Sequence, residues 1–228
     1  MTRPKTDIPE ELRPAILDAV LTHVPFDGWS KASVRAAARD LELDPAMVDL
    51  AYPGGVTDMI RAFSTRADRM AVDALADRDL TALKIREKIA LAVRLRIEVV
   101  AHYREAARAA IAHLALPLNA AAGAAMTWAT SDALWRAVGD TSTDANYYSK
   151  RAILSGVFSA TVLYWLNDES EGWHETWGFL DRRIEDVMRI EKAKGHLKKY
   201  TDRLPNLTRM MGRLRYPEAR SRRSRSGR

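Results

Sequence analysis

Residues 135–179 read WRAVGDTSTDANYYSKRAILSGVFSATVLYWLNDESEGWHETWGF, and this stretch decides the fold of the chain. Gly139-Asp140 ends one helix, and Asp144 or Thr143 can cap the next by accepting free backbone N–H groups. From Ala152 to Leu166 no charged residue occurs, so this helix is expected to be buried on more than one side. It is shorter than the roughly 20 apolar residues that span a bilayer. The stretch therefore predicts a buried helix, followed by a second amphipathic helix from Trp173 to Val187.

Small residues follow one face of the buried helix. Ala152, Gly156 and Ala160 form a ridge, with Ser155 and Ser159 beside it, and the preceding helix starts with the small residues 120–125. Small side chains allow two backbones, or a backbone and a thin ligand, to approach closely. Two interpretations stay open at this point: tight helix packing, or room for an elongated apolar ligand.

The remaining chain also reads as helical. The expected helices span Pro9–Val24, Lys31–Asp40, Asp44–Tyr52, Thr57–Ala76, two segments within Leu80–Ala115, and Ala120–Val138. The basic residues between 86 and 108 are expected to form a solvated face. The sequence thus predicts an all-α protein with a head of residues 1–56, a larger domain of residues 57–190 and a tail of residues 191–228.

Three short helices before a long one are typical of a helix-turn-helix head. The third of them would read the DNA major groove, but it carries Asp44 and Asp49 and no Lys or Arg. Carboxylates repel phosphates, and most of the affinity for DNA comes from cations that neutralise phosphates. We therefore expect a degenerate head and no specific DNA binding.

Motifs of catalysis and of metal binding are missing from the sequence. It contains no phosphate-binding glycine loop, no GxSxG and no HExxH. Its lack of cysteine excludes disulfides and thiolate chemistry. Glu98 and His102 form a single i, i+4 pair, which falls short of the ligand set of a di-iron bundle. No catalytic residue, metal or cofactor is predicted.

Charge is divided unevenly along the chain. Residues 189–228 carry 14 Lys and Arg against 3 Asp and Glu, although the net charge of the whole chain is only +6. After Pro205 this tail combines apolar and basic residues in the pattern of a short amphipathic helix that lies on anionic lipid. The residues predicted to bind membrane are Leu207, Arg209, Met210, Met211, Arg213, Leu214 and Arg215. Nonspecific nucleic-acid binding by the arginines is the alternative.

The pattern W...GD.STD.N.Y..RA at residues 135–152, an apolar helix, and TW.FL at residues 176–180 together resemble the COQ9 family of ubiquinone-biosynthesis proteins. The resemblance extends over roughly residues 12–188. It implies a TetR-like helical bundle, a homodimer, and a lipid-binding accessory role in place of repression.

The resemblance also implies two sites. An isoprenoid or quinone-precursor lipid is expected in a cavity walled by Leu118, Met126, Ile153, Leu154, Val157, Phe158, Thr161 and Val162. A surface is expected to engage the hydroxylase that acts on demethoxyubiquinone, and it comprises Trp135, Asp140, Asp144, Asn146, Tyr147, Tyr148 and Arg151.

From these features we predict a non-catalytic protein that presents a polyprenyl quinone intermediate to a hydroxylase at the membrane. The N-terminus resembles neither a signal nor a transit peptide, so the predicted location is a bacterial cytoplasm, peripheral on the inner face of the cytoplasmic membrane. A TetR-type repressor with a hydrophobic inducer is the alternative, and a scaffold without a ligand is a third interpretation.

Overall fold

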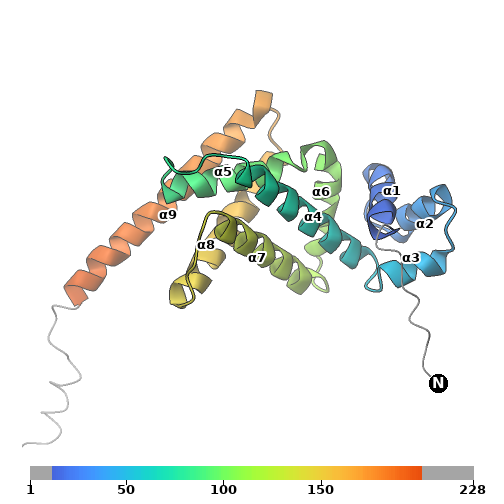
Figure 1. Ribbon diagram of the computed structural model, residues 1–228, viewed down its shortest axis with the longest axis horizontal. Helices are drawn as coiled ribbons and strands as arrows, with labels where there is room; N and C mark the ends of the chain where they lie inside the picture. The colour runs from blue at the N-terminus through green and yellow to red at the C-terminus, as the bar shows by residue number, and fades with distance from the viewer. Residues whose placement is uncertain (1–11, 202–228) are drawn as a thin grey trace, which may run out of the picture. The chain divides into compact units, whose positions relative to one another are not determined.

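The computed structural model describes residues 12–201, with side chains described as far as residue 189. Every regular element in that range is a helix (Figure 1), as predicted. The described residues divide into two units, with the boundary between residues 184 and 185. The division into a head of residues 1–56 and a larger domain of residues 57–190 stays a prediction.

Three helices open the first unit: α1 (Leu12–Asp27), α2 (Lys31–Asp40) and α3 (Pro45–Ala51). The Ser30 hydroxyl caps α2 by accepting from two backbone N–H groups, and the Asp44 carboxylate caps α3 by accepting from the Ala46 N–H at 2.9 Å. The apolar stripe of α1 is buried as the periodicity predicts. Capping and periodicity therefore predict these elements well.

The head helices are joined to the following helices by specific contacts. The indole N–H of Trp29 donates to the carbonyl of Ala106, outside the head, at 2.9 Å, while the Tyr52 hydroxyl donates within the head to the carbonyl of Arg13 at 2.6 Å. Both rings are buried in the same apolar core as the inner face of α4 (Val56–Ala76). The head thus packs on the larger domain within one continuous core.

The region predicted to hold two helical segments contains α5 (Ile85–Glu98), the 3-10 turn η1 (Ala101–Tyr103) and α6 (Arg104–Leu114). Helix α4 packs against α5 and α7, and α6 packs against α1 and α7. Because α5 ends at Glu98, that residue and His102 do not share a helix face. Glu98 instead accepts a hydrogen bond from Arg94 at 2.7 Å.

The prediction that the basic residues of α5 and α6 form a solvated face is wrong for Arg96. Its side chain is buried because Asp68, on the adjacent α4, supplies a carboxylate partner. Two further arginines do not face solvent freely either. Arg104 donates to the carbonyls of Trp165 and Asp168, both at 2.6 Å, and Arg108 donates to the carbonyl of Leu166. These cations satisfy carbonyls at the C-terminal end of the helix that ends at Trp165.

Helices α7 (Ala120–Ala137) and α8 (Ala145–Trp165) lie side by side (Figure 1). Between them Gly139 adopts φ +90°, a left-handed conformation that favours glycine. After the 3-10 turn η2 (Glu171–Trp173), α9 spans His174–Thr201. The buried carboxylate of Asp168 fixes its start by accepting from the backbone and hydroxyl of Thr176 at 2.8 and 2.6 Å.

Candidate functional site

A cavity of about 730 Å³ lies among helices α4 to α8. Its wall is mostly apolar, and seven of its larger side chains are Ile60, Phe63, Ile97, Val100, Ile111, Leu114 and Trp165. Small-molecule sites in proteins commonly have volumes of ~300–1,000 Å³ and predominantly hydrophobic walls. The cavity therefore has the size and the lining of a ligand site.

Small residues create this space where α7 and α8 face each other. Ala120, Gly123 and Ala124 line it from α7, and the residues that line it from the small-residue face of α8 are Ala152, Ser155, Gly156 and Ser159. A Cβ atom added at Gly156 would meet no atom within 4 Å, whereas one at Gly123 would lie 3.2 Å from the Cβ of Leu114. The α8 side of the wall is therefore open, and the α7 side is tightly packed at Gly123.

Of the eight residues predicted to contact the lipid, Met126, Phe158 and Val162 line the cavity. The other five lie elsewhere. Leu154 and Thr161 are buried on the core-facing side of α8, and Leu118 is 98% exposed between α6 and α7. The half-buried residues Ile153 and Val157 lie outside the lining.

The difference has a simple cause. The prediction assigned the bulky residues of α8 to the cavity wall, but a cavity forms where the side chains are small. Most of the remaining lining comes from α4, α5 and α6, and no sequence signal marks those helices as neighbours of α8.

One polar cluster interrupts the apolar wall. Arg96 lines the cavity and is 7% exposed, and its Nε donates to Asp68 Oδ1 at 2.5 Å. The Thr130 hydroxyl donates to the same carboxylate at 2.9 Å, and Arg96 Nη2 donates to the Ser64 hydroxyl at 3.3 Å. Residues of α4, α5 and α7 therefore converge on a single ion pair, which sequence analysis missed because its members are 28 positions apart.

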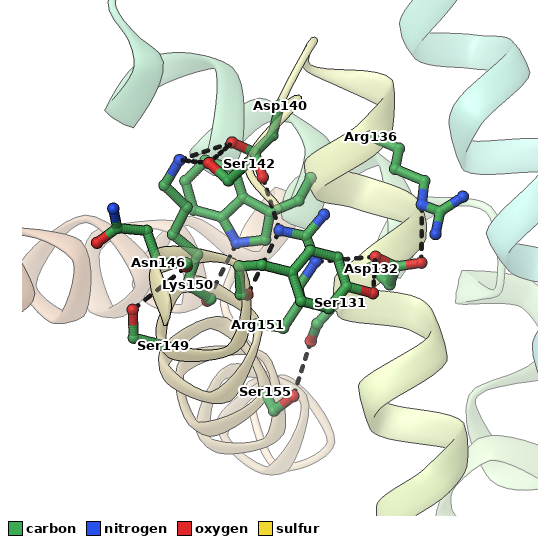
Figure 2. Close-up of polar contacts among 12 residues, drawn as sticks. Ser131, Asp132, Arg136, Asp140, Ser142, Asn146, Ser149, Lys150, Arg151 and Ser155 are labelled. Atoms are coloured by element: carbon green, nitrogen blue, oxygen red, sulfur yellow. Dashed lines mark hydrogen bonds and ion pairs between the residues drawn. The ribbon is translucent and has the colours of Figure 1, made fainter. Parts of the chain in front are cut away.

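A second network joins the C-terminal end of α7 to the start of α8 (Figure 2). Arg151 donates from Nε to Asp132 at 2.8 Å and from Nη1 to Asp140 at 2.6 Å. Lys150 donates to the other oxygen of Asp140 at 2.6 Å, and the Ser142 hydroxyl donates to that oxygen at 2.8 Å. The side chains of Arg151 and Asp140 are only 1% and 5% exposed. The interhelical turn is thus fixed by a buried, mutually neutralising cluster.

The carboxylates of this network are held in the ionised form. Burial opposes the ionisation of Asp140, but hydrogen bonds from Lys150, Arg151 and Ser142 outweigh it, so the pKa of Asp140 lies well below its usual range. Burial also opposes the ionisation of Asp132, and hydrogen bonds led by that from Arg151 lower its pKa. Both aspartates therefore stay charged in the folded protein at neutral pH.

The residues predicted to form a partner surface divide into two groups. Asp140 and Arg151 are buried and cannot contribute to an exposed surface, because they neutralise each other inside the turn. Trp135 is half-buried and donates its indole N–H to the carbonyl of Lys150 at 3.1 Å. Tyr147 is also half-buried.

The remaining members of that predicted surface are exposed. Tyr148 is 64% exposed, Asn146 is exposed, and Asp144 is exposed while it caps α8 by accepting from the Asn146 N–H at 3.0 Å. The Tyr148 ring lies 6.3 Å from the ring of Trp128, which lines the cavity. The exposed aromatic surface therefore borders the cavity wall.

The predicted membrane-binding residues of the tail lie outside the described residues. None of the described helices is both long and apolar enough to cross a membrane. Within the same residues, no group of three or more His, Asp or Glu side chains is arranged to hold a metal ion.

Comparison with known proteins gives two kinds of likeness. Residues 120–191, which include α7 and α8, match the family model described as COQ9. The chain is 30% identical over 190 residues to the mitochondrial ubiquinone biosynthesis protein COQ9-A of Xenopus laevis, covering 78% of this chain and 58% of that protein. It is 30% identical over 192 residues to mitochondrial COQ9 of Homo sapiens, covering 79% and 59%. The chain thus spans about three fifths of the length of these curated relatives.

The second likeness concerns the fold. A TetR transcriptional regulator from Nitrosomonas europaea superposes with a TM-score of 0.64 and 19% sequence identity, over 77% of this chain and 97% of that one. The predicted all-α, TetR-like fold is confirmed.

Proposed function

Because this chain is a COQ9 homologue, we propose that it is a non-catalytic accessory protein of ubiquinone biosynthesis that binds a polyprenyl quinone intermediate. The observation that carries this proposal is the apolar cavity among α4 to α8, because the two helices α7 and α8 that form part of its wall lie inside the matched segment 120–191. An isoprenoid chain is thin and apolar, and it gains about 25 cal/mol for each Å² of surface that it withdraws from water.

The partner in this proposal is the hydroxylase that acts on demethoxyubiquinone, or its equivalent. The proposed contact surface is the exposed part of the turn and first turn of α8, centred on Tyr148 with Asn146 beside it. Tyrosine is a frequent anchor of protein interfaces. Since Trp128 links Tyr148 to the cavity wall, a partner bound there would lie next to the bound lipid.

We propose that the basic tail brings the protein to the anionic surface of the bacterial cytoplasmic membrane, and that the protein acts as a homodimer. Basic residues near such a surface contribute about 1 kcal/mol each, and apolar residues accompany them between 207 and 215. Removing residues 203–228 should abolish binding to vesicles that contain anionic lipid. Undiminished binding would contradict the assignment of the tail.

The exposed residues of α3 favour this role over repression. The side chains that α3 exposes are Pro45, Ala46, Asp49 and Leu50, and none of them carries positive charge. Such a surface lacks the cations that give DNA affinity. A specific operator complex that survives at about 0.15 M salt would favour the repressor instead.

The function is tested by complementation in cells that lack this gene. The intact chain should restore the ubiquinone content, and Gly156→Phe should not, because its side chain would occupy the open side of the cavity. Ala129→Phe is the matched control, since Ala129 is an exposed α7 residue outside the cavity lining. Equal restoration by both variants would contradict a role for the cavity.

A further inference from the structure

We propose that the cavity recognises a ligand whose polar group is an uncharged hydrogen-bond acceptor, and that this group binds beside Arg96. The inference rests on the proposed function, because it assigns a place to the polar end of the same ligand. It follows from the N–H donors of Arg96 and from the ion pair in which Asp68 already neutralises that residue.

Arg96, in the cavity wall, has more N–H donors than acceptors around it. An arginine side chain has five N–H donors and no acceptor. In Arg96, Nε is used by Asp68 and Nη2 by the backbone carbonyl and hydroxyl of Ser64, and no described residue accepts from Nη1. Among the residues that line the cavity in the described part of the chain, Arg96 alone carries a charge. A ligand that enters the cavity therefore meets one strong donor group.

A second lining residue has a donor without an acceptor. Trp165 is 1% exposed, and its indole Nε1 has no hydrogen-bond partner among the described residues. Burying an N–H group without a partner costs roughly 1–3 kcal/mol. Because Nε1 is itself buried, this N–H is not assigned to the cavity, and the charged donor that the wall offers to a ligand is Arg96.

The charge balance decides which kind of acceptor fits. Asp68 already neutralises Arg96, and the Thr130 hydroxyl donates to both oxygens of Asp68 at 2.9 and 3.1 Å. A carboxylate or phosphate would bring a second negative charge to this pair inside an apolar wall, where unpaired charge is costly. A carbonyl or ether oxygen adds no charge and can still accept from Arg96. The site therefore suits a quinone or similar oxygenated ring rather than a fatty acid or a prenyl phosphate.

The wall next to Arg96 also suits a flat ring. The Arg96 guanidinium lies 5.7 Å from the centroid of the Phe158 ring, and both residues line the cavity. Phe63, from α4, lines the same space. Aromatic side chains pack favourably against other rings, so the apolar surroundings of Arg96 favour an aromatic or quinonoid group over a flexible chain.

The experiment compares three ligands with the same isoprenoid chain on the full-length protein. Farnesyl benzoquinone, the hydrocarbon farnesene and the anion of farnesoic acid would compete with a bound fluorescent prenyl probe. We expect the quinone to bind about tenfold more tightly than farnesene, as one hydrogen bond to a charged donor predicts. Farnesoic acid should bind no more tightly than farnesene.

A double variant, Arg96→Met with Asp68→Leu, removes the ion pair without leaving either charge alone. It should keep its affinity for farnesene and lose the preference for the quinone. Its melting temperature shows whether it folds, and if it does not, the ligand series on the unaltered protein decides.

Each outcome has a separate meaning. Equal affinity for quinone and farnesene, or tightest binding by the acid, would overturn the inference and leave lipid binding intact. If neither the probe nor any of the three ligands binds, the proposed function itself fails.

Discussion

Arg151 and Arg96 are both buried, both pair with aspartates, and both lie on helices that pack against α7, but their surroundings differ. Arg151 contacts two carboxylates in a turn that is filled by protein. Arg96 contacts one carboxylate and borders a cavity of about 730 Å³. The same residue type therefore stabilises the turn between α7 and α8 and, on α5, offers a binding group to the cavity. An ion pair alone does not distinguish the structural role from the binding role, because both arginines have one. The cavity next to Arg96 does.

Breaking the filled network should have the largest effect on stability. Arg151→Met removes the shared cation of Asp140, which is 5% exposed, and of Asp132, which is 20% exposed, so the free energy of unfolding should fall by about 3 kcal/mol. Urea denaturation measures this loss. Arg136→Met is the matched control, because Arg136 also pairs with Asp132 but is 68% exposed, and it should have little effect on stability. Equal losses from the two variants would contradict the structural role of Arg151.

Acid should reveal the same network. The pKa values of Asp132 and Asp140 are lower in the folded protein than in the unfolded chain, whose aspartates titrate near pH ~4. Their stabilising contribution is therefore complete above about pH 5 and is lost as the pH falls below 4 toward the folded pKa values. The free energy of unfolding should decrease between pH 6 and 3, and it should decrease less steeply in Asp140→Asn than in the unaltered protein. Parallel curves for the two proteins would contradict the lowered pKa of Asp140.

Adding a methyl group to the cavity wall should stabilise the protein rather than destabilise it. Gly156→Ala removes a helix-interior glycine and places its Cβ in open space, so it should stabilise the protein by about 0.5–1 kcal/mol. Gly123→Ala is the matched comparison on α7, where the new Cβ would lie 3.2 Å from Leu114, and its gain should be smaller or absent. Thermal unfolding of the ligand-free proteins distinguishes the two, and an equal gain would mean that α7 has unused space as well.

The smallest effect on stability is expected at the exposed aromatic surface. Tyr148→Ala should change the unfolding free energy by less than about 1 kcal/mol, because the ring is 64% exposed and its hydroxyl has no hydrogen-bond partner among the described residues. Co-purification with the hydroxylase should nevertheless fall markedly, as expected for an interface anchor. Leu163→Ala, at another exposed α8 residue, is the control for nonspecific loss. Unchanged co-purification by Tyr148→Ala would remove this residue from the proposed surface.

Local signals predicted the helices because helix boundaries are determined locally. Asp144 was predicted as a cap from residue type and spacing, and it accepts the expected backbone N–H. Ser30 and Asp44 cap α2 and α3 by the same local chemistry. The family pattern, which depends on residues close together in sequence, was recognisable for the same reason.

The uncharged run from Ala152 to Leu166 predicted a helix buried on more than one side, which is wrong. Helix α8 buries one stripe that includes Leu154, Thr161 and Trp165, whereas its face with Gly156 and Leu163 is exposed because it borders the cavity.

The candidate site depended on contacts that the sequence does not reveal. Arg96 read as a solvated residue because Asp68, its partner, belongs to another helix. Arg151 read as a surface residue because nothing in its own helix shows that Asp132 and Asp140 enclose it. The cavity wall was assigned to bulky residues such as Leu154, although packing fills space with bulk and leaves it beside small residues.

The central claim, that the space beside Arg96 holds a neutral isoprenoid quinone, is tested most directly by mass spectrometry of lipid extracted from the full-length protein after purification without detergent. The account predicts a near-stoichiometric isoprenoid lipid with an uncharged oxygenated ring, and much less of it in Gly156→Phe than in Ala129→Phe. A protein that carries no lipid, or one that carries only fatty acids or phospholipids in the same amount in both variants, would contradict it.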